Sequence, residues 1–357
     1  MKNIIQYFTA VAAIGVFSVC ALHAEDTKAT NNTAADFSKV GAAGGQFLKI
    51  GVGARATGMG GAYGSISNDV SSLFWNPSGI ADIKEISGSF SYTQWFAGYS
   101  HNFFGGSVPL SDKYRAGISF TSFSSGDIPV TTIEKETGTG AKYQVSDFAL
   151  GLTFAGNVTE QFAFGATLKY VQNAFASVSG SGVAFDIGTI YHTGLQGINV
   201  GFSIHNLGGQ QAYSGQDLNR SGKIVPEQFA SLVEQQLVAN PYNLPLMFRA
   251  SISTDLMSII NGENETPADA EHKWIACADF ETLSDVPEQY SIGTEYVWND
   301  FVAIRGGYKM GHNTLGLAGG LGLKYIGGGF NGQLDYSISP VKDFGIVNRI
   351  SISIRAL

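Results

Sequence analysis

The chain has 357 residues, a net charge of −8 and 14% charged residues, against roughly 25% in an average globular protein. Its 12% aromatic residues argue against disorder, because a disordered chain has too few of them to form a core. The acidic balance argues against a nucleic-acid partner, since phosphates require a positive field. After residue 24 no run of about 18 apolar residues is present, which argues against membrane-spanning helices.

The first residues have the layout of a secretory signal peptide over residues 1–24. Lys2 precedes a mostly apolar stretch, and a polar run follows it. Cleavage after either Ala21 or Ala24 fits this layout. Cys277 is then the only cysteine left, so no disulfide within the chain is expected.

The remaining chain is predicted to have three parts. Residues 25–45 are rich in Thr, Asn and Ala and are predicted to form a mobile linker, residues 46–83 are rich in Gly, and residues 84–357 alternate between apolar and small or polar side chains. Period-2 alternation is typical of β-strands. It predicts fourteen strands, near 85–94, 99–110, 113–123, 145–156, 161–173, 182–193, 197–206, 244–256, 271–281, 288–299, 300–310, 313–326, 330–339 and 346–356.

A soluble β-sandwich and a membrane β-barrel both explain such alternation. In a sandwich the second face should carry many Lys, Glu and Thr, whereas here it is mostly Gly, Ala, Ser and Thr. Many strands are long enough to cross a bilayer at a tilt, and the longest connections (124–144 and 207–243) lie on one side, whereas most connections on the other side are tight, with 257–270 as the exception. These features predict an all-β fold, a 14-stranded antiparallel transmembrane β-barrel in contact with the lipids of the outer membrane of a Gram-negative-type bacterium.

A family resemblance rests on the segment before the barrel. Residues 47–63 read FLKIGVGARATGMGGAY, and Trp75-Asn76-Pro77-Ser78-Gly79-Ile80-Ala81 follows. This pattern resembles the N-terminal signature of the PorV/PorQ proteins, relatives of the FadL-type long-chain fatty-acid transporters. The resemblance implies a fourteen-stranded barrel whose N-terminal segment folds inward as a hatch. Two departures are Ser78, where Ala is usual, and the C-terminal Leu357, where barrels commonly end in an aromatic residue.

The predicted hatch, residues 46–83, has a physical explanation of its own. Its glycines permit positive φ and close packing against a barrel wall, and Asp69 is placed to cap a short helix over 70–75 that Asn76-Pro77 would end. Arg55 is expected either to pair with an inward carboxylate or to contact a ligand headgroup. The predicted hatch residues are Gly53, Arg55, Gly58, Gly60, Gly61, Asp69, Trp75, Asn76 and Pro77.

The phase of the alternation also predicts charged side chains that point into the barrel. They are explained either as a network that braces the hatch or as a substrate path. The predicted lumen-facing residues are Arg115, Lys169, Asp186, His192, His205, Arg249, Lys273, Asp279, Glu295, Arg305, Lys309, Lys324 and Asp335. The histidines lack metal-ligand spacing, the glycines at 51–53 lack the βαβ unit of a nucleotide site, and no nucleophile elbow is present. We therefore expect no metal, no cofactor and no enzymatic activity.

The long connection 207–243 is predicted to contain a helix that starts near Pro226. Its apolar face would consist of Phe229, Leu232, Val233 and Leu237. This face is explained either as packing on the barrel rim or as a surface that closes over an apolar ligand or docks a partner.

Two functions follow from the resemblance. One is assistance to protein export or surface attachment, since PorV/PorQ proteins work with the type IX secretion machinery; the partners would be secretion-machinery or cargo proteins. The other is uptake of a hydrophobic small molecule, as in the FadL-type branch. An apolar lumen with a gap in the wall would favour uptake, and a broad apolar loop surface would favour a protein partner.

Overall fold

A computed structural model describes residues 43–222 and 233–356 of the chain. These residues belong to one structural unit, Lys39–Leu357. The predicted signal peptide and most of the predicted linker lie outside the described residues, so both remain predictions.

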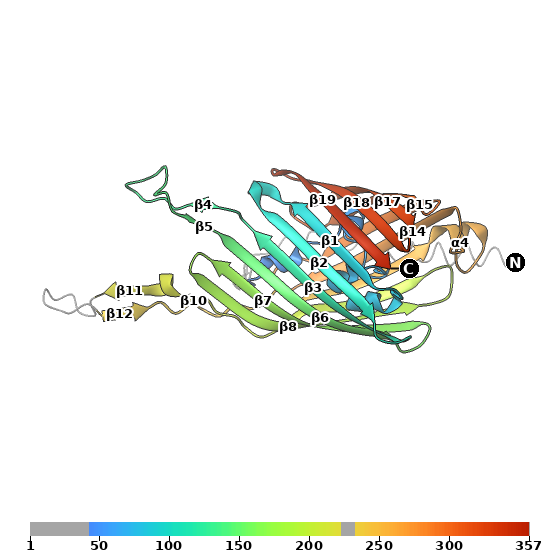
Figure 1. Ribbon diagram of the computed structural model, residues 1–357, viewed down its shortest axis with the longest axis horizontal. Helices are drawn as coiled ribbons and strands as arrows, with labels where there is room; N and C mark the ends of the chain where they lie inside the picture. The colour runs from blue at the N-terminus through green and yellow to red at the C-terminus, as the bar shows by residue number, and fades with distance from the viewer. Residues whose placement is uncertain (1–42, 223–232, 357) are drawn as a thin grey trace, which may run out of the picture. The chain divides into compact units, whose positions relative to one another are not determined.

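The alternating segments form fourteen long antiparallel strands, as the sequence predicts (Figure 1). Each pairs with the next along the chain, and β1 pairs with β19, so the sheet closes into a barrel. The strands are β1 (Ser87–Gln94), β2 (Ser100–Pro109), β3 (Tyr114–Ser124), β6 (Val145–Asn157), β7 (Phe162–Phe175), β8 (Val178–His192), β9 (Asn199–Gly208), β13 (Met247–Asp255), β14 (His272–Leu283), β15 (Gln289–Trp298), β16 (Val302–Met310), β17 (Leu317–Gly327), β18 (Phe330–Val341) and β19 (Gly345–Ala356).

The two faces of the wall differ in chemistry. Outward side chains are large and apolar and remain exposed, for example Leu168 and Ile352, whereas Thr167 and Ser351 beside them are buried. Because side chains alternate between faces, each strand presents apolar residues to the exterior and small or polar residues to the interior. The ladder has a register shift in β8–β9, between Phe185 and Ile187.

The connections divide between the two ends of the barrel. The start of β1 and the end of β19 lie at the end that also carries short turns and the helix α4 (Leu256–Asn261) (Figure 1). The opposite end carries two small hairpins, β4 (Ile128–Pro129) with β5 (Lys142–Tyr143), and β11 (Asn219–Gly222) with β12 (Val233–Gln236). A short strand β10 (Ser214–Gly215), which pairs with β8, and the turn η4 (Gln216–Leu218) precede β11, and the turn η3 (Phe96–Gly98) joins β1 to β2. We call this opposite end the hairpin end.

The prediction of a helix in the connection 207–243 is wrong from Val233 onward, where the structure describes the segment. Val233 begins β12 and pairs with Gly222 of β11, so this segment is one strand of a hairpin. Val233 and Leu237, the described residues of the predicted apolar face, are both exposed, and the backbone of β12 finds its hydrogen-bond partners in β11. Phe229 and Leu232 lie outside the described residues.

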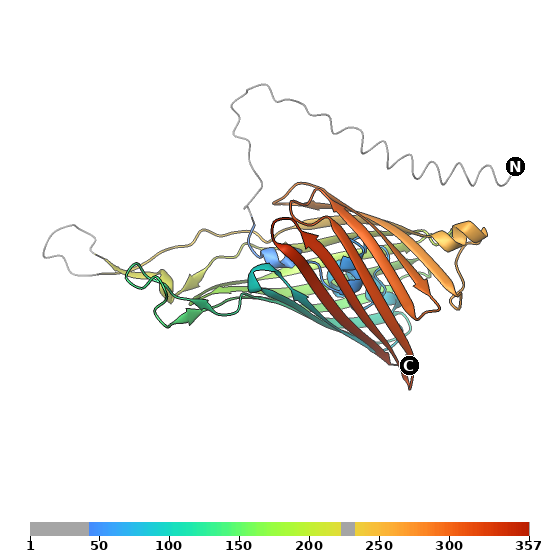
Figure 2. The same ribbon diagram turned by 90° about the horizontal axis from the view of Figure 1, so that it is seen from above.

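The segment before β1 folds into four short helical turns (Figure 2). They are η1 (Gln46–Lys49), α2 (Ala54–Gly58), α3 (Ser72–Trp75) and η2 (Pro77–Asp82). α2 packs on β17 and β18, and η2 packs on β6, β7 and β8, all against inward side chains. None of the helices in the described residues is long and apolar enough to cross a membrane.

Candidate functional site inside the barrel

The predicted hatch segment packs on the inner face of the barrel, and its hydrophobic side chains are buried there. Val52, Met59 and Tyr63 are fully buried, and the largest buried apolar cluster of the described residues is built around them. We use the name hatch for residues 46–83 from here on. Burying these side chains stabilises the contact, at roughly 25 cal/mol for each Å² of apolar surface removed from water.

Arg55 of α2 contacts two carboxylates, Glu295 of the wall and Asp69 of the hatch, and joins the hatch to the wall through the first of them. Its Nη2 and Nε lie 2.7 and 2.9 Å from the two carboxylate oxygens of Glu295 in β15. Its Nη1 lies 3.2 Å from Asp69, and the Tyr63 hydroxyl donates to Asp69 over 2.6 Å. The two bonds between Arg55 and Glu295 form a bidentate pair, which is among the strongest hydrogen-bonding arrangements that a side chain makes. Burial opposes the charge of Asp69, but the guanidinium of Arg55 and the hydrogen bonds from Ser71 and Tyr63 together lower the pKa of that carboxyl.

The same network continues along the wall. Arg305 of β16 contacts Glu295 at 2.5 Å and Asp335 of β18 at 2.8 Å. Asp69, Arg55, Glu295, Arg305 and Asp335 therefore form one chain of alternating charges between the hatch and three strands. In this arrangement each buried charge has an opposite charge beside it, which a low-dielectric interior requires.

A second network surrounds Arg249 of β13. Its guanidinium contacts Glu281 of β14, donates to the Trp75 carbonyl at 2.7 Å, and lies 4.7 Å from the centre of the Trp75 ring. Lys309 contacts the other oxygen of Glu281 at 2.6 Å. Asp279 accepts bonds from the backbone N–H groups of residues 63 and 64 (3.1 and 2.9 Å). This network therefore also bonds directly to the hatch.

A third network lies on β7, β8 and β9, next to β13, and its ion pairs in the described part of the chain join wall residues to one another. Lys169 contacts Asp186 at 2.7 Å, and His205 lies 3.3 Å from the same carboxylate. The lysine also donates to Asn206 at 2.8 Å. The bulge in β8–β9 falls at Asp186, so the network stabilises the part of the wall where strand pairing is interrupted.

The remaining predicted inward residues lie near the end with the short turns. Arg115 donates to the backbone carbonyls of Ile83, Ser111 and Tyr114. Lys273 and Lys324 both contact Asp300 in the turn between β15 and β16. His192 contacts Asp82, the last residue of η2. These groups surround the edge of the barrel and contact the hatch at two points, Ile83 and Asp82.

The glycines of the hatch act in two different ways. Gly53, Gly60 and Gly61 have positive φ, as the sequence analysis expects, whereas Gly58 lies within α2 and does not. Gly60 also approaches the wall so closely that an added Cβ would lie 2.8 Å from the backbone nitrogen of Tyr308. A side chain at Gly60 is therefore disfavoured by both conformation and space.

The Trp75-Asn76-Pro77 turn ends α3 and fixes the hatch to the wall. Trp75 donates to the Val52 carbonyl at 2.9 Å, within the hatch. The Asn76 amide donates to the Gly64 carbonyl and to the Thr189 carbonyl of β8, at 2.9 and 3.1 Å. Asp69 accepts from the backbone N–H of Ser71 at 2.9 Å, just before the start of α3. The helix is thus shorter than the predicted span 70–75.

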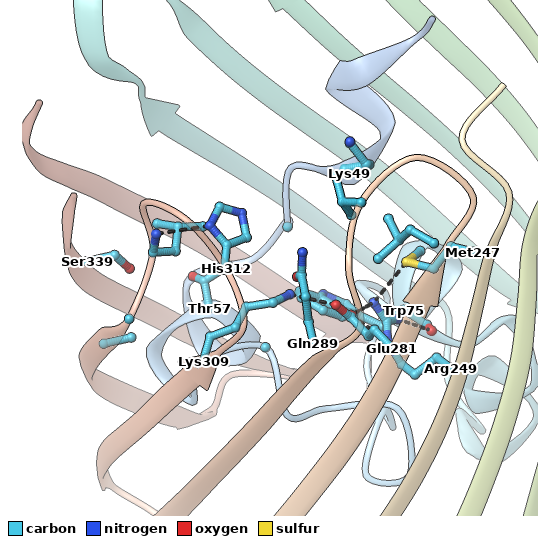
Figure 3. A pocket seen from close by; sticks show the side chains of 18 of the residues that line it. Lys49, Thr57, Trp75, Met247, Arg249, Glu281, Gln289, Lys309, His312 and Ser339 are labelled. Carbon is cyan, nitrogen blue, oxygen red and sulfur yellow. Dashed lines mark hydrogen bonds and ion pairs between the residues drawn. The ribbon is translucent and has the colours of Figure 1, made fainter. Parts of the chain in front are cut away.

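A cavity of about 110 Å³ lies between the hatch and strands β13 to β19, near their hairpin ends (Figure 3). Trp75, Thr57 and Lys49 of the hatch line one side of it, and Arg249, Glu281 and Lys309 line the wall side. A second cavity, of about 20 Å³, lies near Phe74 and Lys169. Both are small beside the roughly 300 to 1,000 Å³ of a pocket for an organic ligand.

Chemical reactivity inside the barrel is limited. Cys277, the free cysteine of the described residues, is buried, and its thiol lies 2.9 Å from the Ala62 carbonyl. Over residues 43–222 and 233–356, no group of three or more His, Cys, Asp or Glu side chains has the arrangement of a metal site.

Three residues of these networks were not among the residues predicted from the sequence. Glu281 and Arg349 are inward charged residues, and Asp285 contacts Lys49 at 2.9 Å. The phase of the alternation identifies two of them, because Glu281 is in step with Asp279 and Arg349 is in step with Ser351. Asp285 lies beyond the end of β14, where the alternation gives no signal.

Comparison with known proteins identifies the family. The family model described as "Type IX secretion system protein PorV" matches residues 32–219, more than half of the chain. The chain belongs to the PorV family. No curated protein matches the sequence.

Solved structures similar to this PorV-family chain share its fold. The CymD monoaromatic hydrocarbon channel matches with a TM-score of 0.55 and 13% identity, over 86% of this chain and 98% of its own. The toluene transporter TbuX of Ralstonia pickettii matches with a TM-score of 0.51 and 11% identity, over 86% and 99%. The P. putida toluene transporter TodX matches with a TM-score of 0.52 and 12% identity, over 86% and 97%. The fold and the family together place this chain among outer-membrane β-barrels.

Proposed function

We propose that this PorV-family barrel assists the export of proteins to the cell surface or their attachment there, after its own signal-peptide-dependent export. In this role the hatch stays in place, and partner proteins bind at the rim of the barrel. The observation that carries the proposal is the polar, filled interior: the hatch is bonded to β15 through Arg55 and to β13 and β14 through Arg249 and Asp279.

The alternative is a channel for hydrophobic molecules, as the titles of the structural neighbours describe for those proteins. Such a channel requires an apolar path through the interior. The lining of the larger inner cavity of the described residues includes the charged side chains of Lys49, Arg249, Glu281 and Lys309 beside apolar ones such as Phe74 and Leu317. Moving an apolar molecule past paired charges would require separating them in a low-dielectric interior, which is energetically costly. The interior chemistry therefore favours the first function.

The loops at the hairpin end supply a surface for a protein partner. The β4–β5 loop exposes Ile133, and the segment after β12 exposes Val238, each with 91% of its surface accessible. Val233 and Leu237 add to the apolar surface near β12. Exposed apolar groups of this kind are favoured where they become covered by a partner. Both ends of the barrel chain lie at the opposite end, so we place the hairpin end outside the cell.

Deleting the gene is expected to reduce specific proteins in the culture medium and on the cell surface while leaving uptake of labelled toluene and fatty acids unchanged. The reason is that paired charges line the larger inner cavity of the described residues, whereas the rim exposes apolar side chains. Quantitative mass spectrometry of secreted proteins, together with uptake assays on the same strains, checks this. Unchanged secretion with impaired uptake would overturn the proposal in favour of the channel.

A further inference from the structure

Arg349 of β19 is a buried cation for which the described residues supply no carboxylate. It is 2% exposed and lines the 110 Å³ cavity. The other cations that line this cavity are each paired: Lys49 with Asp285, and Arg249 and Lys309 with Glu281. Within residues 43–222 and 233–356 no Asp or Glu oxygen lies within 4.0 Å of the Arg349 guanidinium.

The hydrogen-bonding capacity of Arg349 is also largely unused. Its Nη1 donates to the Ser339 hydroxyl at 3.1 Å, and its Nε is buried without a partner in the described part of the chain. Its guanidinium lies 5.7 Å from the centre of the Trp95 ring, so the ring face attracts the cation. The ring does not replace a carboxylate as a hydrogen-bond acceptor, and burying a charge without an opposite charge beside it is energetically costly. A bound anion would offset that cost.

Neighbours of Arg349 on the inner face share this lack of partners. Thr93 of β1 lies directly opposite Arg349 in the strand register, and His101 of β2 lies opposite Thr93. Both side chains are 1% exposed, and neither the Thr93 Oγ1 nor the His101 Nε2 has a hydrogen-bond partner among the described residues. Buried polar groups in folded proteins are nearly always satisfied. Arg349, which lines the cavity, and its neighbours Thr93 and His101 therefore form a buried polar cluster with unused hydrogen-bonding capacity.

His312, in the loop between β16 and β17, adds a donor at the rim of the cavity (Figure 3). Its Nδ1 accepts from the backbone N–H groups of Leu315 and Thr314, at 3.0 and 3.2 Å. Burial, together with the nearby charge of Lys309, lowers the pKa of His312 to about 4. The ring is therefore neutral at neutral pH, and since Nδ1 accepts, its one proton lies on Nε2, which can donate.

We propose that this corner of the cavity is an oxyanion-binding site with Arg349 as its principal ligand. The ligand is a small carboxylate or phosphate-type anion, because a guanidinium offers parallel N–H donors that match the oxygens of such groups. Lys309 and His312 line the approach from the hairpin end. A cavity of about 110 Å³ admits a small anion or the carboxylate end of an extended segment, and it is well below the volume of an organic-ligand pocket.

The test is calorimetric titration of the full-length protein in detergent micelles. The probes are sodium phosphate, sodium acetate, and a short peptide with either a free or an amidated C-terminus. We expect saturable binding of at least one oxyanion probe. Phosphate binding alone would identify a free inorganic anion, and binding of the free-acid peptide but not its amide would identify a protein carboxylate. No saturable binding of any probe up to about 50 mM would overturn the proposal.

Variants assign the binding to Arg349. Arg349→Gln is expected to weaken binding by about ten-fold or more, and Arg349→Lys by less, because the lysine keeps the charge but not the paired donors. Arg355→Gln is the matched control, because Arg355 lies on the same strand and face but donates to the Asn68 carbonyl in the hatch. It should bind as the wild type does. Equal binding by Arg349→Gln and wild type would contradict the assignment.

A second variant keeps the test decisive if Arg349→Gln does not fold, as judged by loss of its heat-modifiable gel band. Lys309→Gln removes a cation from the approach while Glu281 retains its contact with Arg249. It is expected to weaken oxyanion binding by about three-fold or more. Wild-type affinity in a folded Lys309→Gln protein would overturn the proposed approach and, with it, the site.

Discussion

The Arg55→Met variant is expected to lose about 3 to 5 kcal/mol of its free energy of unfolding, because it leaves buried carboxylates without their shared cation. Arg55 is the one residue of the hatch that contacts both Asp69 and Glu295. The Glu295 carboxylate keeps Arg305 but loses two bonds, and Asp69 loses its cation and keeps only neutral partners, the Tyr63 and Ser71 hydroxyls and the Ser71 backbone N–H. Methionine has nearly the same length, so the apolar packing of α2 is preserved.

Guanidinium titration in detergent micelles, followed by circular dichroism, measures this effect. The control is Arg220→Met, which removes an exposed arginine of β11 and should change the free energy of unfolding by no more than about 0.5 kcal/mol. Glu295→Gln should destabilise in the same direction as Arg55→Met. If Arg55→Met were as stable as the control, the bridge would contribute nothing to holding the hatch.

Gly307→Val is expected to prevent normal seating of the hatch. A Cβ at Gly307 would lie 2.1 Å from the carbonyl carbon of Met59 and 2.4 Å from the backbone nitrogen of Gly60. These are backbone atoms, so no side-chain rotation relieves the clash, and overpacking costs at least about 1 to 3 kcal/mol. We expect a lower melting temperature of the heat-modifiable gel band and proteolytic cleavage within residues 46–83.

The adjacent glycine provides a matched control. Gly306 lies on the same strand with its Cβ direction on the opposite face, where a Cβ would meet no atom within 4 Å. Gly306→Val should therefore change stability by no more than about 0.5 kcal/mol. Equal behaviour of the two valine variants would mean that the hatch does not pack against β16 as the structure describes.

The strands could be predicted from the sequence because successive side chains alternate between an apolar exterior and a polar interior. In β7, for example, Leu168 and Tyr170 face outward while Thr167 and Lys169 face inward, so the alternation identifies both the strand and its phase. The same phase places the lumen-facing charges on the inner face. This prediction depends only on a two-residue period in the side chains, which can be seen within a short segment of the sequence.

The partners of those charges could not be predicted, because they are distant in the chain. Arg55 and Glu295 are 240 residues apart and meet only after the barrel closes. The alternation places both of them inside, but it gives no depth along the barrel axis. The helix predicted within the connection 207–243 is wrong over its described part for a related reason. Apolar residues at helical spacing fit a helix, but the pairing of Val233 with Gly222 depends on a partner that local spacing does not reveal.

The proposed function depends on a hatch that stays in place while the protein works, and a covalent lock tests this most directly. Thr57 of α2 and Ser337 of β18 are both buried, and their hydroxyl oxygens lie 2.9 Å apart. This separation brings two cysteines at these positions within reach of a disulfide. The lock combines Thr57→Cys and Ser337→Cys with Cys277→Ser, so that no other thiol of the described residues competes.

The decisive measurement is the amount of secreted and surface-attached protein in the deletion strain that carries the locked barrel. The account predicts that the oxidised, locked barrel restores secretion to the level given by the wild type and by each single-cysteine variant. Failure of the locked barrel to restore secretion, with recovery after reduction of the disulfide, would contradict it, because the hatch would then have to move for the protein to work.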